Sequence, residues 1–113
     1  MDSLETRQVI QATCPDCGGP LSEIRHGELR EYRCLVGHAY SPRSLLLAHS
    51  DGQERALWSA VKSLEEGAEL VLLVRPQLPA ALAERLDEQA ALKRRQAAQI
   101  RGVLERLEPF QVE

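Results

Sequence analysis

Cys14-Pro15-Asp16-Cys17 is followed, after sixteen residues, by Cys34-Leu35-Val36-Gly37-His38. A Cys-x2-Cys pair on a turn presents two sulfurs to one ion, because the turn directs backbone N–H groups at the thiolates. Gly18 and Gly19 follow the first pair and Gly37 lies within the second, and glycine suits such tight turns. Three thiolates and one imidazole favour tetrahedral Zn²⁺. We therefore predict a zinc site with four ligands: Cys14, Cys17, Cys34 and His38.

This ligand set predicts a structural rather than a catalytic metal. Catalytic zinc keeps a position open for water, whereas three cysteines and one histidine occupy all four positions of a tetrahedral ion. The sheet expected around the two motifs is too small to be stable alone. Zinc binding of roughly 10 to 16 kcal/mol, as in small zinc peptides near neutral pH, would then act as folding free energy.

Three other interpretations of these residues remain open. Cys14 and Cys17 could form a redox disulfide, although the strand-to-helix context of a thioredoxin-like site is absent. Iron–sulfur ligation is chemically possible for the same four residues. His38 could also lie outside the ligand shell, in which case Asp16 or a water molecule would complete it.

The segments around the motifs indicate short strands. Residues 21–25 alternate in character, His26-Gly27 suits a tight turn, and Leu29–Cys34 follows as a second strand. Val9–Thr13 can add a third strand. We therefore expect residues 1–42 to form a small zinc ribbon of two to three antiparallel strands.

From Ser41 onward the composition changes to Leu, Ala, Glu, Arg and Gln, which predicts helices. Ser41 followed by Pro42 is typical of a helix start, and a short helix through Leu45–Leu47 should follow. Ser50 and Gln53 have the spacing of a new capping box after a break. The fold class we expect is therefore α+β, with domains at 1–42 and 43–113.

Two long helices should form an antiparallel hairpin after this break. The first runs to about Arg75, and the second spans about Pro79 to Leu107, with prolines at the connection. Their apolar residues step by three or four positions, which keeps one stripe towards a partner helix. The expected stripes are Leu57, Val61, Leu64, Ala68 and Val71 in the first helix, and Leu86, Ala90, Lys93, Ala97, Ile100, Leu104 and Leu107 in the second. Lys93 interrupts the second stripe and is expected to snorkel.

The composition and the motifs argue against several classes of function. The 113 residues carry a formal net charge of −3, so overall charge does not attract nucleic acid or acidic lipid. No apolar run spans a bilayer and no signal peptide is recognisable, so we expect a soluble, cytoplasmic, unprocessed chain. The sequence has no nucleophile elbow, phosphate loop or paired-histidine motif, which predicts a protein that is not an enzyme and has no small-molecule substrate.

Several segments together resemble a known family. Cys14–Leu21, Tyr32–Ser41, Ser44–Leu46 and Glu54–Trp58 resemble, in this order, the C-terminal zinc-ribbon segment of bacterial chemotaxis-type protein-glutamate methylesterases. The likeness covers residues 13–66, and the four predicted ligands fall on the positions that the pattern uses for metal. Methylesterases of that type carry their Ser-His-Asp catalysis in an upstream α/β domain, and this chain begins just before the ribbon. The resemblance therefore implies a sensory or receptor-modification pathway, without esterase activity.

Our leading hypothesis is a zinc-binding adaptor that binds a protein partner or a second copy through helical apolar surface. Trp58, Leu72 and Leu73 lie off the predicted stripe, so a hairpin cannot hide all of its apolar residues. A nucleic-acid-binding module is the alternative, because Lys93, Arg94, Arg95 and Arg101 form a basic cluster. A thiol redox sensor acting through Cys14 and Cys17 is a third hypothesis.

Overall fold

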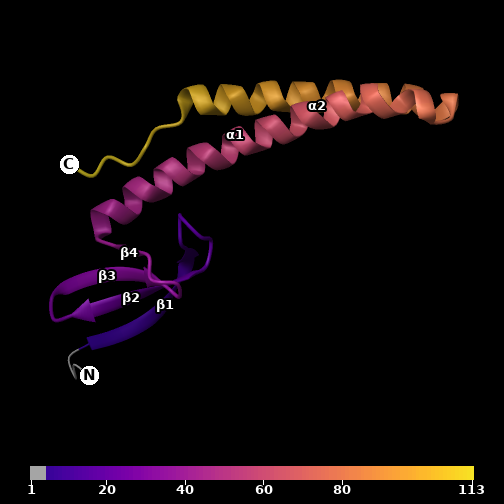
Figure 1. Ribbon diagram of the computed structural model, residues 1–113. Coiled ribbons are helices and arrows are strands. Elements are labelled where there is room, and N and C mark those ends of the chain that lie inside the picture. The colour runs from indigo at the N-terminus through magenta and orange to yellow at the C-terminus, as the bar shows by residue number, and fades with distance from the viewer. Residues whose placement is uncertain (1–4) are drawn as a thin grey trace. The chain divides into compact units, whose positions relative to one another are not determined.

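The computed structural model describes residues 5–113 as four strands followed by two long helices (Figure 1). Two compact units are present: the described residues up to Gly52 together with Pro109–Glu113, and Gln53–Glu108. The predicted α+β class is confirmed. The elements are β1 (Glu5–Thr13), β2 (Pro20–His26), β3 (Leu29–Cys34), β4 (Ala39–Tyr40), α1 (Pro42–Val74), the 3₁₀ turn η1 (Arg75–Gln77) and α2 (Ala80–Arg106).

The strands form one antiparallel sheet in the order β1-β2-β3-β4. The predicted β2–β3 hairpin is confirmed, with a register from Leu21 opposite Cys34 to His26 opposite Leu29. The strand expected at Val9–Thr13 is longer, because β1 starts at Glu5. Its polar residues lie at the sheet edge, where both strand faces are solvated and no apolar alternation is required.

The ribbon unit has its own small core. Cys14, Leu21, Cys34 and Tyr40 are buried together. Leu45 and Ala48 of α1 pack against this cluster, so the first turns of the helix belong to the ribbon's core. Two of the predicted metal ligands therefore lie inside the only apolar cluster that the described part of this unit contains.

The start of α1 agrees with the predicted cap. The amide N–H of Ser44 donates to the Ser41 hydroxyl at 3.1 Å, and the amide N–H of Ser41 donates to the Ser44 hydroxyl at 2.9 Å. These reciprocal bonds satisfy donors that have no partner within the helix.

The predicted helix break at Ser50 to Gln53 is wrong. α1 runs without interruption from Pro42 to Val74, so the expected short helix and first long helix are one element. A glycine inside a helix costs only about 1 kcal/mol relative to alanine, which is too little to end a helix that packs on both sides of Gly52. Ser50 does not cap a new helix; its buried hydroxyl accepts the backbone N–H of Phe110 at 3.0 Å. The predicted domain boundary at residue 42 stays a prediction, and the two compact units divide within α1.

The second unit is the predicted antiparallel hairpin, as Figure 1 shows. Val61, Ala68 and Val71 of α1 and Ala90 and Ala97 of α2 are buried. Small side chains at these contacts allow two helix backbones to approach closely. The predicted stripes therefore form the seam of the hairpin, except at one position.

Lys93 is that exception. Its side chain is exposed, and its aliphatic stem lies over the backbone of Gly67, since a Cβ at Gly67 would lie 3.2 Å from Lys93 Cδ. The stem therefore covers the seam while the ammonium group stays at the surface, as snorkelling predicts. No helix among residues 5–113 combines the length and apolar character that a bilayer crossing needs.

Candidate metal centre

The two cysteine motifs lie on turns at the ends of strands. In the first turn the N–H of Gly18 donates to the Cys14 carbonyl at 2.8 Å, and the N–H of Cys14 donates to the Gly19 carbonyl at 2.7 Å. In the second turn the N–H of Cys34 donates to the carbonyl of His38 at 3.1 Å. The sheet register then sets the turns side by side, because Cys34 lies opposite Leu21.

Both turns need a backbone conformation that favours glycine. Gly18 has φ = 76° and Gly37 has φ = 103°. A side chain with a Cβ is strained at these angles, which explains the glycine in each motif.

The structure brings all four predicted ligands together. Their ligand atoms lie within 4.8 Å of one another, close enough to hold one metal ion. The Nδ1 atom of His38 is 3.6 Å from Cys14 Sγ and 3.3 Å from Cys34 Sγ. The three cysteines are free thiols. Metal ligation through Nδ1 requires the imidazole proton to be on Nε2.

The four side chains differ in their contact with solvent. Cys14 and Cys34 are buried, whereas Cys17 and His38 are exposed. Each motif therefore supplies one inner and one outer ligand.

The turns stabilise two of the three cysteines as thiolates. Burial opposes ionisation of Cys34, but the backbone N–H groups of His38 and Val36 more than compensate and lower its pKa to about 6. Burial likewise opposes ionisation of Cys14, and the Tyr40 hydroxyl with the N–H groups of the first turn lowers its pKa below the ordinary value. N–H groups that point at sulfur favour its charged form, which is the form that binds metal.

The pKa values of the two outer ligands, Cys17 and His38, are both raised. The backbone N–H of Gly19 lowers the pKa of Cys17. Desolvation and the neighbouring sulfurs of Cys34 and Cys14 together raise it by more, so the net shift is upward. The hydrogen bond to the Cys34 sulfur raises the pKa of His38, against desolvation.

A residue that the sequence analysis did not select lies beside the ligands. The hydroxyl of Tyr40, in β4, is 3.2 Å from Cys14 Sγ and donates a hydrogen bond to the Asp16 carboxylate. Burial raises the pKa of Tyr40, and its hydrogen bonds with Asp16 and Cys14 raise it further. Asp16, considered above as a substitute ligand, is thus engaged with Tyr40 and is not among the four convergent residues. The only sequence signal was the position of Tyr40 two residues after His38.

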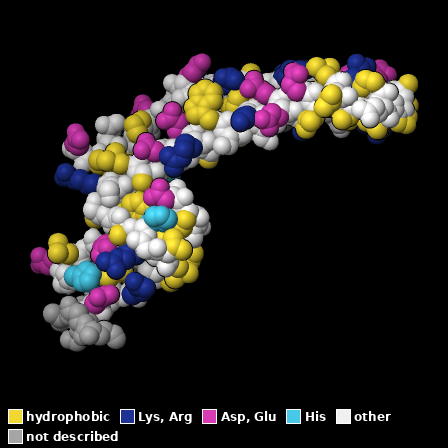
Figure 2. Space-filling view, in the orientation of Figure 1, with side chains coloured by type: hydrophobic (Ala, Val, Ile, Leu, Met, Phe, Trp, Pro, Cys, Tyr) yellow, Lys and Arg dark blue, Asp and Glu magenta, His cyan; other side chains and the backbone are white. Residues whose placement is uncertain are grey.

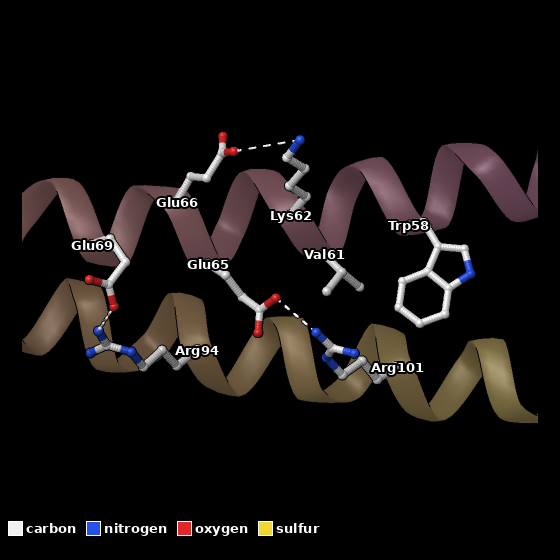
Figure 3. A pocket seen from close by; sticks show the side chains of 8 residues that line it. All are labelled: Trp58, Val61, Lys62, Glu65, Glu66, Glu69, Arg94 and Arg101. Atoms are coloured by element: carbon white, nitrogen blue, oxygen red, sulfur yellow. Dashed lines mark hydrogen bonds and ion pairs between the residues drawn. The ribbon is translucent and has the colours of Figure 1, made fainter.

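The basic cluster of α2 is partly engaged within the hairpin. Arg94 forms an ion pair with Glu69 at 3.1 Å, and Arg101 forms one with Glu65 at 2.9 Å (Figure 3). The Arg101 guanidinium also lies 5.4 Å from the ring centroid of Trp58. These contacts reduce the positive charge that two of the four basic residues offer to a polyanion, so the structure adds no support to the nucleic-acid alternative.

Comparison with known proteins gives no match: no family model, curated protein sequence or solved structure is significantly similar to the chain. The resemblance to methylesterase zinc ribbons stays a prediction.

Proposed function

We propose that the protein is a zinc-binding, non-catalytic interaction module. The convergence of Cys14, Cys17, Cys34 and His38 is the observation that carries the proposal. Ligand atoms around a tetrahedral zinc, with Zn–S of about 2.3 Å and Zn–N of about 2.0 Å, stand roughly 3.5 Å apart. The two sulfur-to-Nδ1 distances in this cluster, 3.6 and 3.3 Å, are close to that value. Three thiolates favour zinc over harder cations such as Mg²⁺.

The same ligand set supports a structural role. Four protein ligands leave no position for a reacting water, and the ribbon's buried cluster is small. Three free thiols are stable in a reducing compartment, which supports a cytoplasmic location. The resemblance to methylesterase ribbons favours a sensory pathway.

Metal content tests the first part of this proposal. The chain purified without chelator should contain one zinc ion per molecule, measured by elemental analysis. Replacement by Co²⁺ should give the absorption bands of a tetrahedral thiolate site, because Co²⁺ adopts the same geometry. A folded ribbon that contains no metal and binds none would contradict the proposal.

The hairpin supplies a surface for the interaction. Around the turn from α1 to α2, hydrophobic side chains gather at the surface (Figure 2). Leu73 is the most exposed of them, with 68% of its surface accessible. We call this surface the hairpin tip; it consists of Leu70, Leu72, Leu73, Val74, Leu78 and Leu82. An apolar surface that nothing in the described chain covers favours association.

Charge at the hairpin tip favours a second copy as the occupant. Arg75 is the only charged residue between positions 70 and 83, and Asp87 neutralises it at a distance of 2.9 Å. Two identical tips therefore do not repel each other, and a two-fold dimer buries the same patch on both chains. An acidic lipid surface would require a collar of basic residues, which the tip lacks.

Two variants that carry opposite charges at position 73 test this dimer. The native chain should dimerise in light scattering, whereas Leu73→Glu and Leu73→Lys should each be monomeric, because two like charges meet across the two-fold axis. Mixing the two variants should restore a dimer. Leu92→Glu is the control, since Leu92 is an exposed leucine of α2 outside the tip. A native chain that stays monomeric at all concentrations would refute the proposed dimer, and a partner protein would then be sought.

A further inference from the structure

The side-chain hydroxyl of Ser50 has one partner in the structure and a second one in the sequence pattern. In the structure Ser50 is buried within α1, and its hydroxyl accepts the backbone N–H of Phe110 at 3.0 Å. The ring of Phe110 lies near the imidazole of His49, with 6.0 Å between the two ring centroids. The segment Pro109–Glu113, which we call the tail, therefore belongs to the ribbon unit although it follows α2 in the chain.

The second partner is the backbone N–H of Gln53. Ser50 and Gln53 have the spacing of a capping box, in which the serine hydroxyl accepts the N–H of the residue three positions later and the glutamine side chain accepts the serine N–H. Asp51 and Glu54 would lie in the first turn of a helix that begins here, where acidic side chains are favoured. The observed first turn of α1 contains no acidic residue. Residues 50–53, which we call the inner start, thus carry the signals of an independent helix start.

The two hydrogen bonds of Ser50 exclude each other. A capping residue has a non-helical backbone, and its hydroxyl accepts an N–H from the first turn of the helix. Inside a continuous helix the N–H of Gln53 is already bonded to the carbonyl four positions earlier, so the Ser50 hydroxyl can accept a bond from the tail. The tail is therefore held at Ser50 only while α1 continues through this residue.

The packing of the ribbon decides between these two arrangements. Residues 42–52 belong to the ribbon unit, where Leu45 and Ala48 pack against the buried cluster of the sheet. An isolated helix shorter than about 12 to 15 residues is marginal in water, and the glycine at position 52 weakens this part further. If the ribbon unfolds, residues 42–52 lose their support. The helix from Gln53 onward belongs to the other unit and keeps its seam with α2.

We propose that Ser50 is a conformational switch that releases the tail when the ribbon loses its metal, an inference that rests on the proposed zinc site. With metal bound, α1 begins at Pro42 and Ser50 holds the tail. Without metal, the helix begins at the inner start, and the Ser50 hydroxyl accepts the N–H of Gln53 instead of that of Phe110. The tail is then released from the ribbon unit.

Hydrogen exchange at two backbone amides tests this switch. NMR would follow the amides of Phe110 and Gln53 in the zinc-bound chain and after zinc removal by a chelator. The Phe110 amide should exchange slowly with zinc bound and at the rate of an unfolded chain without zinc. The Gln53 amide should stay protected in both states, first by the continuous helix and then by the Ser50 hydroxyl.

Ser50→Ala should affect a different amide in each state. In the zinc-bound variant the Phe110 amide should lose its protection, whereas the Gln53 amide keeps the bond of the continuous helix. After zinc removal the Gln53 amide should lose its protection too, because no hydroxyl remains to cap the helix. Ser59→Ala is the matched control, since Ser59 is an exposed serine of α1 beyond the inner start. This control should change neither amide.

Gln53→Ala decides if Ser50→Ala does not fold. Gln53 is exposed in α1, and its capping bond to Ser50 forms only in the metal-free chain. Loss of that bond should therefore destabilise the metal-free state alone and tighten zinc binding by at least about twofold, the lower end of the effect of a capping contact. Chelator competition would measure the dissociation constant. Gln96→Ala, at an exposed glutamine of α2, should leave it unchanged.

The outcomes separate this inference from the proposed function. A native chain that binds no zinc would refute the site itself. Stoichiometric zinc with a Phe110 amide that stays protected after zinc removal would overturn only the switch. A metal-free Ser50→Ala chain that still protects the Gln53 amide, or an unchanged zinc dissociation constant in Gln53→Ala, would overturn it as well.

Discussion

Replacement of Cys34 with serine should release the metal and unfold the ribbon. Cys34 is one of two buried ligands and also belongs to the ribbon's core. Structural zinc in small peptides contributes roughly 10 to 16 kcal/mol, as much as the whole stability of an ordinary domain at about 5 to 15 kcal/mol. The sheet cannot compensate for such a loss. Elemental analysis should find less than one zinc per chain, and the amide resonances of β2 and β3 should collapse to positions typical of an unfolded chain.

The hairpin provides an internal reference for this experiment. Ala68, Val71 and Ala90 form a core of their own, so the resonances of Gln53–Glu108 should keep their dispersion in the Cys34→Ser variant. Leu35→Ser is the matched control, because Leu35 follows Cys34 directly and is exposed. This control should keep its zinc. Stoichiometric zinc on a folded Cys34→Ser ribbon would contradict the ligand assignment.

Leu21→Ala should produce the largest loss of stability without removing a ligand. Leu21 has 0% of its surface accessible and lies in one cluster with Cys14, Cys34 and Tyr40. Truncation of a buried leucine to alanine costs about 2 to 5 kcal/mol, from lost transfer free energy and the cavity that remains. The loss in free energy of unfolding would be measured by urea denaturation with saturating zinc. The fluorescence or amide signals of the ribbon would monitor the unfolding.

A leucine of the same sheet serves as the control. Leu29 lies at the start of β3 and has 73% of its surface accessible, so Leu29→Ala should change stability by no more than about 0.5 kcal/mol. Equal effects of the two substitutions would show that Leu21 is not the centre of the core.

Local patterns sufficed to predict much of this fold. The spacing of Cys14 to Cys17 and of Cys34 to His38 defines two turns, and the hairpin between them sets the turns side by side. The stepping of Val61, Leu64, Ala68 and Val71 by three or four positions likewise predicts the seam, because the side chains of one helix face recur at that interval. In both cases the residues that determine the structure lie within a short stretch of sequence.

The features that the sequence did not reveal depend on contacts between distant residues. Ser50 has the local pattern of a cap, but its hydroxyl accepts a hydrogen bond from Phe110, sixty positions later. The Tyr40 hydroxyl meets Asp16, twenty-four positions earlier, and no residue near either one indicates the pair. The polar start of β1 lacks alternation because an edge strand needs none. Such contacts become visible only once the strands and helices have their places.

The division of the four ligands into an inner and an outer pair has a kinetic consequence. Cys17 and His38, which are exposed, would be the ligands open to a chelator or to a thiol of another protein, whereas the buried Cys14 and Cys34 would be shielded. The residence time of the ion would depend on the concentration of competing ligands in the surroundings as well as on how tightly the ribbon binds it.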